Sequence, residues 1–196
     1  MIKLNLDIQT QTQLKRLINA KCYEFLGFTL NLDNNTLIDN LNPSTQTLPN
    51  EPAVKLITPL LHHYTLSTPA PLTNQLIKFK DLPGGYAYEG TFINRAIKPL
   101  EQIFGKTPQL LAKATKLLGG RQLNLGDSSA EISALRGIPL TLILYSSEEF
   151  NASANILYDK SAANFLPTED LAVLGELTTL RLIEANKKLT PDCNIC

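Results

Sequence analysis

Apolar residues recur at helical spacing in several segments of the chain. The repeats predict helices at residues 8–19, 53–64, 88–104, 107–118 and 168–187. The segment at 107–118 carries the clearest signals, because Thr107 can cap its start, Pro108 suits the first turn, and Gly119-Gly120 ends it. Thr168 is the expected cap of the last helix.

Other segments follow the two-residue alternation of strands. Residues 22–32 alternate as one strand, Asp33-Asn34-Asn35 predicts a turn, and residues 36–41 return. The predicted fold is α+β, with one mixed, largely antiparallel sheet covered by the helices. Its strands come from residues 22–41, 76–80, 121–145 and 155–158. Residues 1–189 are expected to form a single domain, followed by a short tail at 190–196.

Composition and charge narrow the class of protein. The chain has 196 residues, 43% of them apolar, which is enough for one large core. Lys plus Arg equal Asp plus Glu at 18 each, so no net field favours nucleic acid or a membrane surface as a partner. The sequence has no long apolar run and no signal-peptide core at its start. A cytoplasmic protein is therefore expected.

Polar and glycine residues at the predicted strand ends outline a candidate ligand cleft. Gly84 and Gly85 lie between a strand and a helix, where backbone N–H groups can approach an anion. A simple tight turn explains the same two glycines. The other candidates are two tyrosines, two arginines and an aspartate: Tyr86, Tyr88, Arg121, Arg136 and Asp127.

The loop after the strand at 138–145 carries adjacent carboxylates, Glu148 and Glu149. With Asp127 and Asp159 they could hold a divalent cation in a metal-assisted hydrolase or transferase. A solvated acidic turn is the alternative interpretation. Arg136 precedes the same strand, and we expect it to form an ion pair with one of these four carboxylates.

The chain ends in Cys193-x-x-Cys196, a spacing that suits zinc, an iron–sulfur cluster or a dithiol. Cys22 is the one other thiol, so a complete four-ligand site would need His62 or His63, a second copy of the chain, or a partner protein. Two incidental thiols at a frayed terminus are the alternative.

Three stretches resemble a prokaryotic domain-of-unknown-function family, number 3786. They are LPGGYAYEGTF (82–92), LGGRQLNLGDSSAEI (118–132) and the block from Ile138 to Leu177. The resemblance implies a fold and a setting in anaerobic bacteria and archaea, where some members are fused to an iron–sulfur module. It implies no catalytic residues.

The leading functional hypothesis is an accessory ligand-binding domain of anaerobic redox metabolism. Its partner would be a small molecule or a redox protein, and the sequence specifies no cofactor. Two alternatives stay open. One is the metal-assisted enzyme of the Glu148/Glu149 loop, and the other is a scaffold that shares a metal or iron–sulfur site through Cys193 and Cys196.

Overall fold

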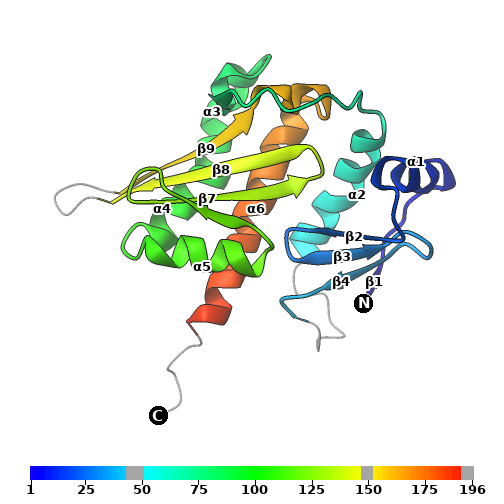
Figure 1. The fold of residues 1–196 in the computed structure, drawn as a ribbon, viewed down its shortest axis with the longest axis horizontal. Helices are drawn as coiled ribbons and strands as arrows, with labels where there is room; N and C mark the ends of the chain where they lie inside the picture. The colour runs from blue at the N-terminus through cyan, green and yellow to red at the C-terminus, as the bar shows by residue number, and fades with distance from the viewer. Residues whose placement is uncertain (43–50, 147–151, 191–196) are drawn as a thin grey trace, which may run out of the picture.

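The computed structural model describes residues 1–42, 51–146 and 152–190, and for residues 51–54 it describes the backbone alone. Its strands form two antiparallel sheets (Figure 1). In spatial order, the smaller sheet contains β1 (Ile2–Lys3), β4 (Thr36–Asp39), β3 (Phe28–Asn31) and β2 (Cys22–Phe25). The larger contains β5 (Leu76–Lys78), β9 (Ser153–Asp159), β8 (Ile138–Tyr145), β7 (Ser128–Leu135) and β6 (Arg121–Leu123).

Helices pack around and between these sheets. They are α1 (Ile8–Ile18), α2 (Glu51–Thr65), α3 (Gly85–Phe92), α4 (Lys98–Phe104), α5 (Gln109–Leu117) and α6 (Thr168–Leu189). The predicted α+β class is confirmed. The predicted single sheet is instead two sheets, because the strands of residues 22–41 pair among themselves and not with the later strands. None of these helices is long and apolar enough to cross a membrane.

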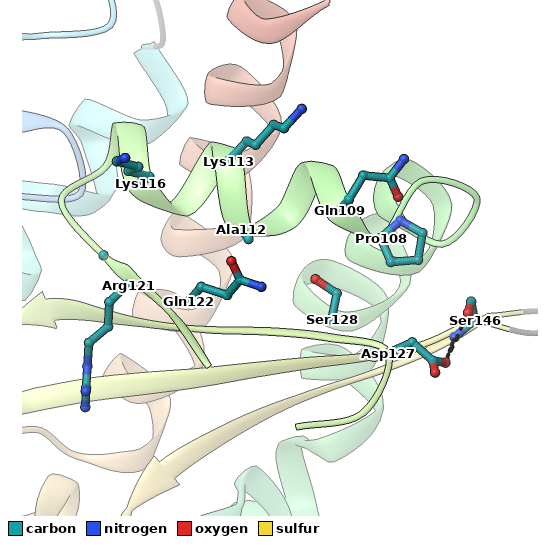
Figure 2. A pocket seen from close by; sticks show the side chains of 11 residues that line it. Pro108, Gln109, Ala112, Lys113, Lys116, Arg121, Gln122, Asp127, Ser128 and Ser146 are labelled. Atoms are coloured by element: carbon teal, nitrogen blue, oxygen red, sulfur yellow. Dashed lines mark hydrogen bonds between the residues drawn. The ribbon is translucent and has the colours of Figure 1, made fainter. Parts of the chain in front are cut away.

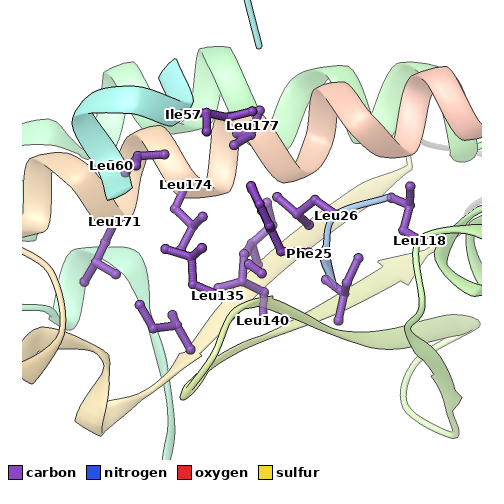
Figure 3. Close-up of a cluster of buried hydrophobic side chains, with 14 of the residues drawn as sticks. Phe25, Leu26, Ile57, Leu60, Leu118, Leu135, Leu140, Leu171, Leu174 and Leu177 are labelled. Atoms are coloured by element: carbon purple, nitrogen blue, oxygen red, sulfur yellow. The ribbon is translucent and has the colours of Figure 1, made fainter. Parts of the chain in front are cut away.

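The longest helix, α6, organises the core. It crosses the strands of the larger sheet on one face (Figure 1), and its buried leucines meet leucines of β7 and β8 in one apolar cluster (Figure 3). The Tyr158 hydroxyl of β9 donates a hydrogen bond to the Leu171 carbonyl at 2.8 Å, which fixes the sheet against this helix. Acidic residues in the first turn of α6 and lysines in its last turn complement the helix dipole.

The smaller sheet reaches the same core through the turn between β2 and β3. Leu26 and Gly27 form a two-residue turn with φ values of 48° and 73°, the geometry of a primed hairpin turn. Leu26 is fully buried. The single strand predicted at 22–32 is therefore wrong, since the chain reverses at this turn and leaves β2 and β3 as separate strands.

The predicted helix at 88–104 has a π-helical segment at Ile93–Ile97 between α3 and α4. Pro99, near the start of α4, has no N–H and would crowd the carbonyl four residues earlier in a regular helix. A wider π turn relieves that conflict. The Ala96 carbonyl then accepts a hydrogen bond from the Thr179 hydroxyl of α6 at 3.0 Å, so the irregular segment is anchored to the core.

Candidate functional site

The two glycines of the predicted cleft shape a turn. Gly84 has φ = 76° and precedes α3, and Gly85 begins that helix. A Cβ atom at Gly85 would lie 2.1 Å from the Phe79 carbonyl oxygen, so this close backbone approach requires glycine. The neighbouring tyrosines are at the surface: Tyr86 is 80% exposed, and Tyr88 donates a hydrogen bond to Glu169 Oε1 at 2.9 Å. That hydrogen bond and the charge of the carboxylate raise the pKa of Tyr88.

Gly84 and Tyr88 line a pocket of about 300 Å³ beside the start of α6. Arg121 and Asp127 line a different pocket of about 730 Å³. The first pocket follows β5 and the second adjoins β6, and these strands are the two edges of the larger sheet. Four interstrand spacings separate those edges by roughly 20 Å. The predicted single cleft is therefore divided between two sites.

The larger pocket lies between α5 and the strands β6 and β7, and we call it the α5–β7 pocket (Figure 2). Its described lining consists of Pro108, Gln109, Ala112, Lys113, Lys116, Gly120, Arg121, Gln122, Asp127, Ser128 and Ser146. Such a volume falls in the range of small-molecule sites. The lining is rich in amide, hydroxyl, ammonium and carboxylate groups, which suits a polar ligand.

The α5–β7 pocket has its charges at different ends. Figure 2 shows Lys116 and Arg121 at one end, and Asp127 with Ser146 at the other. Arg121 Nε donates to Glu131 Oε1 at 2.9 Å, and this partner raises the pKa of the guanidinium. Asp127 Oδ2 accepts from the Ser146 N–H at 2.7 Å and from its hydroxyl at 3.0 Å.

Between these ends, the Gln122 amide and the Ser128 hydroxyl point toward the space below α5 (Figure 2). Ser128 lines the pocket, and its hydroxyl has no hydrogen-bond partner within residues 1–42, 55–146 and 152–190. This hydroxyl is not among the fully buried polar atoms that lack a partner, so it is accessible from the pocket. Ser128 therefore offers a free donor and acceptor to a ligand.

Arg136 does not line either pocket, and among the described residues it does not form the expected ion pair with Asp127 or Asp159. It lies in the two-residue turn between β7 and β8, where its guanidinium donates to the carbonyls of Leu17 and Ile18 at 3.3 and 2.6 Å. These carbonyls end α1, so Arg136 caps that helix. The eight residues of β8 hold its two ends about 25 Å apart, which separates Arg136 from Asp127.

The carboxylates that were predicted to hold a cation have different outcomes. Glu148 and Glu149 lie outside the described residues. Asp159 Oδ1 accepts hydrogen bonds from Thr73 and Ser161, and Oδ2 accepts from the Asn74 N–H at 2.7 Å. Burial opposes ionisation of Asp159, but these hydrogen bonds outweigh it and hold its pKa well below the ordinary value. Asp159 therefore stabilises the fold around β9.

The predicted cysteine site also lies mainly outside the described residues, which include neither Cys193 nor Cys196. Cys22 is a free, exposed thiol on β2. His62 and His63 point to different partners: His62 Nδ1 lies 2.8 Å from the Thr10 hydroxyl, and His63 Nδ1 lies 2.5 Å from Asp170 Oδ2. Among the described residues, no three His, Cys, Asp or Glu side chains gather closely enough to hold a metal ion.

Sequence reasoning missed most of the α5–β7 pocket. Lys113 and Lys116 are one turn apart on the exposed face of α5, a pattern that normally indicates only a solvated helix surface. Gln109, Gln122 and Ser128 carry no motif at all. The available signal was the pair Arg121 and Asp127, which bracket β6 and its following turn.

Comparison with known proteins assigns the chain to a family. The model of the family described as Domain of unknown function (DUF3786) matches residues 19–181. The chain belongs to this family, as the resemblance in its sequence indicated. The match includes α5, β6 and β7, and therefore the described lining of the α5–β7 pocket. No curated protein and no solved structure matches the chain.

Proposed function

We propose that the protein is an accessory ligand-binding domain and that its ligand occupies the α5–β7 pocket. The observation that carries this proposal is a pocket of about 730 Å³ whose wall presents the Ser128 hydroxyl, which has no hydrogen-bond partner among the described residues. The surrounding amides and charged groups would orient a small polar molecule. The metabolic setting, anaerobic redox metabolism, comes from the family resemblance.

The chemistry of the described lining supports a binding role. Its side chains include amides, hydroxyls, ammonium groups and one carboxylate, but no imidazole or thiol. His62 and His63, the two histidines of the chain, are on α2 and already contact Thr10 and Asp170. These groups suit recognition, because they can hold a ligand by hydrogen bonds and charge.

The proposal is tested by a ligand screen with a pocket-filling variant. Ala112 lines the pocket, so Ala112→Phe should block it, and Ala87→Phe adds the same side chain at an exposed position of α3. A compound at one hundred times its Kd should raise the Tm of the wild type and of Ala87→Phe by about 5–10 °C. Binding that survives in Ala112→Phe, or a broad polar library without any hit, would reject this site.

The redox setting needs a separate measurement. Protein purified without oxygen is examined by metal analysis and visible spectroscopy, beside the double variant Cys193→Ser/Cys196→Ser. Stoichiometric iron with thiolate absorption that disappears in the variant would favour the cluster-sharing scaffold. A colourless, metal-free protein would leave ligand binding as the function to pursue.

A further inference from the structure

We infer that the α5–β7 pocket takes an elongated small molecule with an anionic group at one end and a hydroxyl or ammonium donor at the other. This inference rests on the proposed function, because it names the chemical class of the ligand for the same pocket. Its basis is the separation of charge along the pocket, with Lys116 at one end and Asp127 at the other (Figure 2).

The basic end has positive charge that the described part of the protein leaves unmatched. Arg121 is paired with Glu131, so its charge is largely used within the fold. Lys116 and Lys113 have no acidic partner within the described ranges. Both are exposed, and their long side chains can turn toward a phosphate or carboxylate near the C-terminal end of α5, although Figure 2 shows Lys113 pointing away from the space below the helix.

The opposite end is built to accept hydrogen bonds. Ser146 holds Asp127 through Oδ2, while Oδ1 has no hydrogen-bond partner among the residues that the structure describes. An ionised carboxylate can only accept, so this oxygen would select a hydroxyl or ammonium group and repel a second anionic group. A ligand with anionic groups at both ends is thereby disfavoured.

The middle of the pocket can donate hydrogen bonds to a ligand or accept them from it. The Gln122 amide and the Ser128 hydroxyl each supply both functions, and Ser128 is positioned by its strand. A sugar phosphate has this arrangement of groups: a phosphate at one end and hydroxyls along the remainder. Glucose 6-phosphate therefore serves as a probe, with inorganic phosphate and glucose as its two separate halves.

Binding of the three probes is measured by titration of ¹⁵N-labelled protein, following the amide signals of α5, β6 and β7. We expect glucose 6-phosphate to bind at least tenfold more tightly than phosphate or glucose. Lys113→Ala/Lys116→Ala should weaken both phosphate-bearing probes about tenfold. Asp127→Asn should weaken glucose 6-phosphate several-fold and leave phosphate unchanged. Lys106→Ala, at an exposed lysine outside the described pocket lining, is the control and should change nothing.

Equal affinity for glucose 6-phosphate and phosphate, or affinities that the lysine and aspartate variants leave unchanged, would overturn the inference. The same holds if these probes fail while a compound of another class binds and is blocked by Ala112→Phe. That result would reject the ligand class and preserve the proposed function. If no compound of any class binds the pocket, both are rejected.

Discussion

Two sets of charged residues in this molecule show opposite uses of charge. One surrounds Arg181 of α6, which is fully buried, donates to Asp39 Oδ1 at 2.6 Å and to the Leu26 carbonyl at 3.0 Å, and also contacts Glu184. The other is the α5–β7 pocket, where Lys113, Lys116 and Asp127 keep unused hydrogen-bonding capacity. The charged groups of the first set, which we call saturated, are paired with one another inside the protein. Those of the second set can bind a ligand.

The saturated set explains how the smaller sheet is attached. Arg181 reaches the turn between β2 and β3 and lies 3.8 Å from the centre of the Phe28 ring, so one side chain of α6 holds the smaller sheet against this helix. Burial alone would raise the pKa of Asp39, but hydrogen bonding and charge from Arg181 outweigh it and keep that pKa low. Burial raises the pKa of Glu184. The cluster thus depends on its arginine.

The largest expected effect comes from removing that arginine. Arg181→Met keeps an unbranched side chain but leaves Asp39 buried without its cation, which should lower the free energy of unfolding by about 3–5 kcal/mol. Urea denaturation measures this loss. Arg95→Ala is the control, because Arg95 is an exposed arginine 3.6 Å from Glu176, and its loss should cost about 1 kcal/mol or less. Equal costs for the two variants would contradict the distinction between saturated and open charges.

A second test uses Asp159, another saturated carboxylate. Its folded-state pKa is depressed, so its contribution to stability is present above its unfolded pKa of about 3.9 and is lost as pH falls through the folded value. Asp159→Asn places an amide against the Asn74 N–H and should cost roughly 2 kcal/mol or more at pH 7. The gap between variant and wild type should narrow steadily below about pH 4. A gap that is independent of pH would exclude a role for the ionised carboxylate.

A third test concerns the adjacent glycines Gly84 and Gly85, where backbone conformation and close packing determine the cost of a substitution. Gly85→Ala forces a methyl group against the Phe79 carbonyl and should cost roughly 1–3 kcal/mol, near the upper end of that range. Gly84 has open space around its Cβ position but a positive φ, so Gly84→Ala should cost about 1 kcal/mol. Gly90→Ala, with open space and no positive φ, should be neutral or slightly stabilising. Thermal unfolding measures the three costs. If Gly85→Ala were the least destabilising of the three, the close approach to the Phe79 carbonyl would not constrain this position.

Local sequence patterns predicted much of the fold. They failed within residues 22–32, where the buried positions change from odd to even residue numbers. The helix at 107–118 was found because its apolar spacing and the glycines that end it agree with α5, although Pro108 takes the N-cap position and the expected Thr107 cap does not form. Residues 22–32 also alternate, but the buried positions are Tyr23 and Phe25 before the turn and Phe28 and Leu30 after it. This change from odd to even positions marks the two-residue turn. The turn is missed when residues 22–32 are interpreted as one alternating strand.

The candidate site was less predictable because it depends on contacts between distant segments. Lys116 and Asp127 join one pocket only because α5 packs beside β6 and β7, and no local signal gives that arrangement. Arg136 illustrates the converse. Its position before a buried strand suggested a carboxylate partner, whereas tertiary packing places it against the end of α1. A charged residue near a strand end thus predicts a role only once its partners are known.

The smallest effect on stability is expected where the effect on binding is greatest. Lys113→Ala/Lys116→Ala removes two exposed charges without acidic partners in the described chain, so the free energy of unfolding should change by about 0.5 kcal/mol or less. The same variant should weaken phosphate-bearing ligands about tenfold. Urea denaturation and ligand titration on one sample separate the two quantities. A large loss of stability would show that these lysines belong with Arg181 among residues the fold requires, and the contrast between the two sets of charges would then fail.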